Sequence, residues 1–171
     1  PAVGRDLQKT AFKAALIAAV LMLIYISLRF DFLSGLSSVI CLIHDVLVMI
    51  SVYVIFGLPM NVNFIAAALI IFGYSINASI ITFDRIRENM KYEKRGDVDT
   101  IVNKSIWQTF TRNINTTLTT LFTIVLIYLF GVPSLQNFSL PIIIGIVSGA
   151  YSSIFIASPL WTKLRKAFKK V

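Results

Sequence analysis

Two ionisable residues of this chain stand inside long apolar stretches, where a charge needs a partner. Asp45 lies midway along the apolar run 35–58 and directly follows His44, the only histidine. A carboxyl at such a position is costly to place in a membrane, so it must face other helices or water. Two interpretations follow: Asp45 forms a structural hydrogen bond to a neighbouring helix, or it binds and releases a proton.

Arg112 is the second such residue. It precedes the end of the apolar run 107–131 by about 19 residues, or roughly 28 Å of helix, and Ala78 lies about 15 residues, or roughly 22 Å, into the run 62–83. Both positions therefore fall in the inner half of a membrane and are able to face each other. Arg112 either extends its guanidinium to the inner interface or belongs to a polar seam between two helices. The residues assigned to this ion-coupling seam are Arg112, Asn77, Ser75, Ala78 and Asp45.

Other chemistry finds little support in the sequence. A single cysteine, Cys41, and a single histidine argue against a disulfide framework, a zinc site and a serine–histidine triad. Asp45 has no second carboxylate at helical spacing, and no serine has a base placed by a motif. We therefore expect no enzymatic activity, no metal and no cofactor.

The elements that carry these residues are five apolar runs. The chain of 171 residues is 57% hydrophobic and only 14% charged, which is beyond what a water-soluble core of this size can bury. Each run has about 20 residues or more, enough to cross a hydrocarbon core of about 30 Å as a helix. The sequence therefore predicts an all-α integral membrane protein with a bundle of five transmembrane helices. The predicted helices are 11–30, 35–58, 62–83, 107–131 and 138–161.

Charge in the connections predicts the orientation. The loops 58–62 and 131–137 carry no charge, whereas the connection 84–106 and the C-terminal tail hold most of the basic residues behind the net charge of +8. By the positive-inside rule, we expect the N-terminus outside and the C-terminus inside. The basic residues are then flanks of membrane helices beside anionic lipids, and nucleic-acid binding is not expected. Within the connection, 86–104 is expected to form an amphipathic segment on the inner surface, broken at Gly96-Asp97.

Three segments carry a resemblance to a known family. They are His44-Asp45, Gly73-Tyr74-Ser75-Ile76-Asn77 and Phe83-Asp84-Arg85-Ile86-Arg87-Glu88-Asn89. They resemble the signature of SecF, the smaller half of the SecD–SecF protein-export complex in the resistance-nodulation-division (RND) superfamily. The similarity extends through Arg112 to the glycines Gly145 and Gly149, whose spacing favours close helix packing. The residues placed in this structural motif are His44, Gly73, Asp84, Arg85, Arg87 and Glu88.

The resemblance implies half of an RND-type membrane domain. Family members have six helices, with a large extracytoplasmic domain after the first, so this chain is similar to the last five. We expect the first helix and that domain to precede Pro1 in a larger polypeptide. The implied location is the cytoplasmic membrane of a bacterium or archaeon. The implied partners are a SecD-like subunit, a SecYEG-type translocon, the translocating unfolded polypeptide and membrane lipids.

The implied function is to use the proton or sodium motive force to drive late polypeptide translocation. The family's proposed relay pairs an arginine, which corresponds to Arg112, with a carboxylate, which corresponds to Ala78. Because alanine binds no proton, three explanations stay open: the SecD half supplies the carboxylate, the residue is an engineered substitution, or another ion is coupled. Two other functions also stay open, half of an RND-type exporter of small molecules or lipids, and a membrane scaffold that transports nothing.

Overall fold

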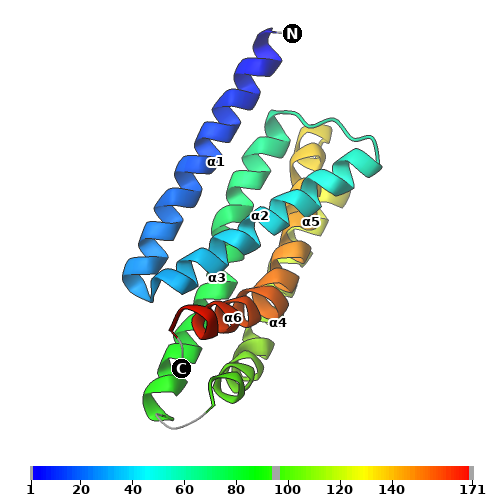
Figure 1. Ribbon diagram of the computed structural model, residues 1–171. Coiled ribbons are helices and arrows are strands. Elements are labelled where there is room, and N and C mark those ends of the chain that lie inside the picture. The colour runs from blue at the N-terminus through cyan, green and yellow to red at the C-terminus, as the bar shows by residue number, and fades with distance from the viewer. Residues whose placement is uncertain (1, 94–96, 170–171) are drawn as a thin grey trace.

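The computed structural model describes residues 2–93 and 97–169, and almost all of these residues are helical (Figure 1). The helices are α1 (Ala2–Arg29), α2 (Phe32–Ile55), α3 (Val62–Tyr92), α4 (Val98–Phe130), α5 (Pro133–Ser152), the π-helical turn η1 (Ser153–Ala157) and α6 (Ser158–Lys169). Within the described residues, five helices are long and apolar enough to cross a membrane, the last running through α5, η1 and α6. The predicted all-α fold with five spans is confirmed.

Short polar signals separate the first three helices. The Asp31 side chain caps α2 by accepting a hydrogen bond from the Ser34 backbone N–H at 2.8 Å, and Asn61 caps α3 in the same way through Phe64 at 3.2 Å. Between α2 and α3, Gly57 has a φ of 63°, in the left-handed region that glycine adopts without strain. These caps supply acceptors for backbone N–H groups that have no partner inside the helix.

The last span bends at η1. Five residues with π-helical hydrogen bonds interrupt the regular pattern there, which is a known cause of helix kinks. Figure 1 shows α6 turning away from α5 and running across the bundle. The predicted helix 138–161 therefore begins earlier, at Pro133, and continues through the kink to Lys169.

Helices α3 and α5 form the centre of the bundle and approach each other closely. A Cβ built on Gly145 would lie 2.5 Å from Cγ1 of Ile71, and one built on Gly149 would lie 3.1 Å from Cβ of Ser75. Any side chain larger than the hydrogen of glycine would force the neighbouring atoms to move at both positions. The packing role predicted for these two glycines is confirmed.

The connection between α3 and α4 differs from the prediction. Residues 86–92 continue α3 and residues 98–104 begin α4, so the segment is the end of a helical hairpin and not a separate helix. Contacts between the two helices hold the hairpin: Asn89 Nδ2 donates to Ser105 Oγ at 2.8 Å, and Lys104 pairs with Glu93. Of the predicted break at Gly96-Asp97, Gly96 lies outside the described residues, and Asp97 is the non-helical residue that precedes α4. The inner-surface position of the hairpin stays a prediction.

Helices α1 and α4 are the least covered by the rest of the chain. Large apolar side chains are exposed along both, for example Leu21 and Leu28 on α1 and Phe122 and Leu126 on α4. A span that crosses a membrane presents such side chains to lipid or to neighbouring helices.

Candidate functional site

Asp45 lies at the point where α2, α3 and α5 meet, and its side chain is fully buried. Three hydroxyls donate hydrogen bonds to its carboxyl: Ser75 from α3 at 2.6 Å and Ser152 from α5 at 2.9 Å to Oδ2, and Ser148 from α5 at 2.8 Å to Oδ1. Each carboxyl oxygen therefore has a hydroxyl partner from another helix. We call Asp45, Ser75, Ser148 and Ser152 the carboxyl hub.

His44 connects the hub to the surface of the bundle. Its Nδ1 lies 3.1 Å from Oδ1 of Asp45, while about a third of its own side chain (36%) is exposed. The imidazole also lies beside the ring of Tyr151 from α5, with the ring centroids 6.5 Å apart. Asp45 therefore has one exchangeable neighbour that reaches the exterior, which is an arrangement able to pass a proton.

The small residues of α5 make the hub possible. Because Gly149 has no side chain, α5 comes close enough to α3 for the neighbouring serines to reach the carboxyl. A Cβ at this position would lie 3.5 Å from Oδ2 of Asp45 and 3.2 Å from Oγ of Ser75. Ser148 and Ser152 are four residues apart and so lie on one face of the helix.

A second polar region lies between α3 and α4. Asn77 and Ala78 of α3 line a very small cavity, about 10 Å³, together with Tyr74, Ile81, Asn113, Thr116 and Thr117. Asn113 is buried; its Nδ2 donates to Oγ1 of Thr82 at 3.2 Å, and its Oδ1 has no hydrogen-bond partner among the described residues. The cavity is of the size that holds a single water molecule.

Arg112 lies next to this cavity in sequence but does not line it. Its side chain is exposed, and it enters none of the hydrogen bonds or ion pairs found among the described residues. On α4, the residues that face Ala78 are instead Asn113, Thr116 and Thr117. The structure therefore brings Asp45 and Ser75 together, places Asn77 and Ala78 in a separate region, and leaves Arg112 on the outer surface of this chain.

Of the remaining motif residues, Asp84, Arg85, Arg87 and Glu88 lie in the last part of α3, and Gly73 lies near its middle. Arg85 donates to Glu88 at 2.6 Å and to Gln108 of α4 at 2.7 Å, and Arg87 donates to the backbone oxygen of Arg29 at 2.8 Å. These bonds join α3 to α4 and to the end of α1. Asp84 and Gly73 are exposed, and a Cβ built on Gly73 would meet nothing within 4 Å.

Sequence reasoning missed Ser148 and Ser152 as partners of Asp45. The available signal was the repeat of small residues along α5, in which two serines alternate with Gly145 and Gly149 at four-residue spacing. That repeat shows which face of α5 is packed. It does not show which residue, more than 100 positions earlier in the chain, packs against that face.

These features define a class of protein. The chain has five helices able to span a membrane and a buried carboxyl with hydroxyl partners where three of them meet, and the described residues hold no group of three or more His, Cys, Asp or Glu side chains placed for a metal. The chain is thus a multi-pass membrane protein of the all-α type. Comparison with known families then places it: residues 1–167 match the family "Protein export membrane protein SecD/SecF, C-terminal", and the chain belongs to that family.

Individual relatives agree with this family. The SecF subunit of the protein translocase of Alicyclobacillus acidocaldarius is 44% identical over 99% of this chain and 56% of its own length. The SecDF subunit of Bacillus subtilis is 42% identical over 94% of this chain and 22% of its own length. The chain thus spans about half of the SecF relative and about a fifth of the fused SecDF relative.

A solved structure has the same arrangement of helices. The crystal structure of SecDF from Thermus thermophilus, a translocon-associated membrane protein, matches with a TM-score of 0.91 and 40% sequence identity. The match covers 97% of this chain and 23% of that one. The fold is therefore that of the SecDF membrane domain.

Proposed function

We propose that this chain is the membrane part of an accessory subunit of the Sec protein-export machinery, and that ion motive force drives its action late in polypeptide translocation. The observation that carries the proposal is the family membership over residues 1–167. Relatives at 38–44% identity are named protein translocase subunits SecF or SecDF.

The carboxyl hub supports ion coupling. Asp45 is a carboxyl in the interior of a membrane domain, held by hydroxyls from two neighbouring helices and reached from the surface through His44. Moving one charge through 100 mV releases about 2.3 kcal/mol, so one or two ions are enough to bias a conformational equilibrium. At position 78, in the α3–α4 region, the family resemblance leads us to expect a carboxyl, and this chain has alanine instead.

The exposed polar surface of α3 and α4 supports a SecD-like partner. Asn77 on α3 and Arg112 on α4 are both exposed, and polar or charged side chains in a span face protein or water and not lipid. In relatives such as SecDF of Bacillus subtilis, a single chain is named for both SecD and SecF. We infer that a SecD-like half covers this surface and faces Arg112 with a carboxylate. The SecYEG-type translocon and the unfolded polypeptide complete the expected partners.

The orientation belongs to the same proposal. The basic hairpin and α6 lie on the cytoplasmic side of the membrane, and the uncharged turn between α2 and α3 lies on the opposite side, as the positive-inside rule predicts. With this orientation, the buried carboxyl lies between the two faces of the membrane.

The test is export of a secretory polypeptide into inverted membrane vesicles that contain the complete complex with its SecD-like partner. We expect the complex to increase the yield of fully translocated polypeptide several-fold when a proton or sodium gradient is present, and to have little effect without one. Equal stimulation with and without either gradient would contradict ion coupling. No stimulation under any condition would contradict the export function itself.

A scaffold that transports nothing is the second candidate, and Ala78 favours it. A chain without that carboxyl can still assemble through the exposed surface of α3 and α4 while leaving ion coupling to its partner. In that case Asp45→Asn and Arg112→Met would leave gradient-dependent export unchanged, whereas loss of the whole subunit would destabilise the complex.

A further inference from the structure

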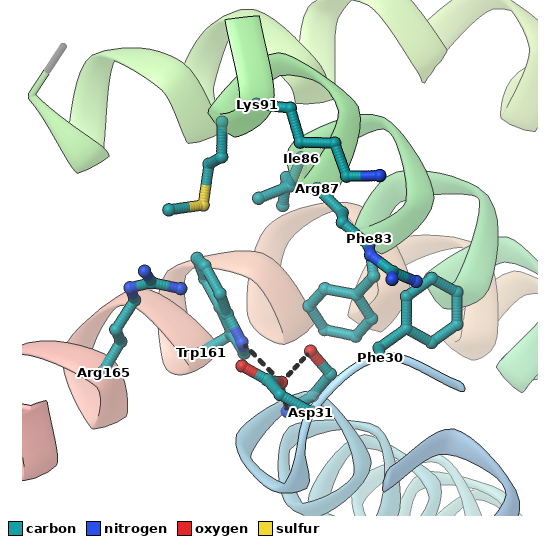
Figure 2. A pocket seen from close by; sticks show the side chains of 10 residues that line it. Phe30, Asp31, Phe83, Ile86, Arg87, Lys91, Trp161 and Arg165 are labelled. Atoms are coloured by element: carbon teal, nitrogen blue, oxygen red, sulfur yellow. Dashed lines mark hydrogen bonds between the residues drawn. The ribbon is translucent and has the colours of Figure 1, made fainter. Parts of the chain in front are cut away.

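A cavity of about 260 Å³ lies at the basic end of the bundle, the end at which α3 and α4 form their hairpin and α6 crosses. Three separate parts of the chain surround it: the α1–α2 turn with the start of α2, the last three turns of α3, and α6 (Figure 2). The lining residues are Phe30, Asp31, Ser34, Phe83, Ile86, Arg87, Met90, Lys91, Trp161 and Arg165. One ordered water needs only about 10–15 Å³, so this cavity has room for a much larger ligand. It is distinct from the carboxyl hub, with which it shares no residue.

The cavity combines an apolar wall with basic groups. Figure 2 shows the rings of Trp161, Phe83 and Phe30 along one side, with Arg165 next to Trp161 and Lys91 above. Phe83, Ile86 and Trp161 are almost completely buried, so this apolar wall is part of the packed core. A ligand that fits must therefore carry both an anionic group and an apolar portion.

Two of the basic side chains have hydrogen-bond donors without an acceptor among the described residues. The Nε atom of Arg165 is buried and has no hydrogen-bond partner among the described residues, although its guanidinium lies over the Trp161 ring at 5.0 Å. Lys91 is exposed and enters none of the hydrogen bonds or ion pairs found in the described part of the chain. A buried donor without an acceptor is costly, so an acceptor supplied by a ligand would satisfy Arg165.

The carboxyl of Asp31 also lies in the cavity, and one of its two oxygens is already hydrogen-bonded. Its Oδ1 accepts hydrogen bonds from the Ser34 backbone N–H at 2.8 Å and from the Trp161 indole N–H at 3.2 Å. Three basic side chains, Arg87, Lys91 and Arg165, outnumber this one acid. A neighbouring cavity shares Arg87 and Lys91 and adds Arg29, Asp84 and Glu88, of which Glu88 is paired with Arg85. Basic side chains therefore outnumber acidic ones by two in the cavity with the apolar wall and by one in its neighbour.

We propose that this cavity binds an anionic phospholipid from the membrane leaflet at the basic end of the bundle. Its phosphate lies between Arg165 and Lys91, and the upper part of an acyl chain lies against Phe83, Ile86 and Met90. Basic pockets between membrane helices are suited to anionic headgroups, and a soluble phosphate would leave the apolar wall uncovered. A lipid bound there would join α6, the α1–α2 turn and the hairpin, and so stabilise the kinked end of the bundle.

The test compares phosphatidylglycerol with phosphatidylcholine in the full-length protein that carries this chain, purified in detergent. Native mass spectrometry counts retained lipids, and a phosphatidylglycerol with a photoactivatable acyl chain locates them. We expect phosphatidylglycerol to be retained at least tenfold better, with crosslinks to residues 83–91 and 161–165. Each basic residue near an anionic surface strengthens binding about fivefold, so the double variant Lys91→Gln/Arg165→Gln should weaken retention about thirtyfold.

The matched control is Lys163→Gln/Lys166→Gln, which removes the same charge from the same end of the protein but changes no residue of the cavity. We expect less than a threefold effect from it. Equal losses in the two double variants, equal retention of the two lipids, or crosslinks elsewhere would each overturn the proposal. Glycerol phosphate without acyl chains should not compete, and effective competition by it would also refute a lipid site. Because the crosslinking arm uses the unmodified protein, it decides the matter even if a variant fails to fold.

Discussion

The carboxyl hub leads to a quantitative prediction for two substitutions of Asp45. Asp45→Ala removes the acceptor of three hydroxyls; among the described residues, Ser152 alone of the three has a second acceptor, the backbone oxygen of Gly149 at 3.3 Å. Hydrogen bonds between membrane helices average about 0.6 kcal/mol, and bonds to charged groups contribute about 1.5 kcal/mol or more. Three of them give a predicted loss of about 2 to 5 kcal/mol.

Asp45→Asn should cost far less, under about 1 kcal/mol. The amide has the same shape, its oxygen still accepts from Ser148, and its NH₂ group has two hydrogens to donate to the hydroxyls of Ser75 and Ser152. Those hydroxyls need only rotate to become acceptors. Asp45→Asn therefore preserves the packing of the hub while it removes the group that binds a proton.

The assay is thermal unfolding of the full-length protein in lipid nanodiscs, followed by export measured with and without an ion gradient. At about 2–4 °C per kcal/mol for a domain of this size, Asp45→Ala should unfold about 4–20 °C lower and Asp45→Asn within about 4 °C of the parent. Unchanged unfolding of Asp45→Ala would refute the hub as a structural junction. An equal loss for both variants would show that charge, and not hydrogen-bonding shape, holds the helices. If Asp45→Asn folds and keeps normal gradient-dependent export, Asp45 carries no proton in the cycle.

Three further predictions concern other faces of the bundle. Gly145→Ala should destabilise the protein by about 1–3 kcal/mol because its Cβ would overlap Ile71, and the loss measured by thermal unfolding should be smaller in an Ile71→Ala background. Arg112→Met should abolish gradient-dependent stimulation of export while the chain still co-purifies with the SecD-like partner. If Arg112→Met supports normal gradient-dependent export, the arginine is structural. Ala78→Asp should be tolerated in the same export assay. A cysteine at Asp99 should react with an impermeant maleimide only from the cytoplasmic side, and labelling from outside alone would invert the proposed topology.

Hydropathy was sufficient to predict the five spans, because a membrane helix must be apolar over about 20 residues whatever its neighbours are. It was not sufficient to find the true ends of α3 and α4. Charged residues such as Arg87 and Lys91 end the apolar run but are good helix formers. Helix α3 therefore continues beyond its predicted end at residue 83, and α4 begins before its predicted start at residue 107. Hydropathy marks where a segment leaves the membrane, and helix propensity decides where the helix stops.

The candidate site was only partly predictable for a related reason. A carboxyl in the middle of an apolar run must be buried with partners, so the position of Asp45 alone indicated its environment. The identity of Ser148 and Ser152 depends on how α5 packs against α2, which no local pattern contains. Arg112 shows the same limit: its distance along the helix placed it level with Ala78, but a difference of one residue, or about 100° of rotation, gives Asn113 the inward position.

The two polar regions are joined by α3. Ser75 points into the carboxyl hub, while Asn77, two residues or about 200° further around the helix, is exposed on the surface expected to face the partner. No proline or break in the helix separates them, so a rotation of α3 caused at one face must appear at the other. Because Gly145 and Gly149 leave no free space between α3 and α5, such a rotation would have to repack the hub and exchange its hydroxyl partners. Asp45→Asn therefore perturbs the face of α3 that carries Ser75, opposite the face that carries Asn77.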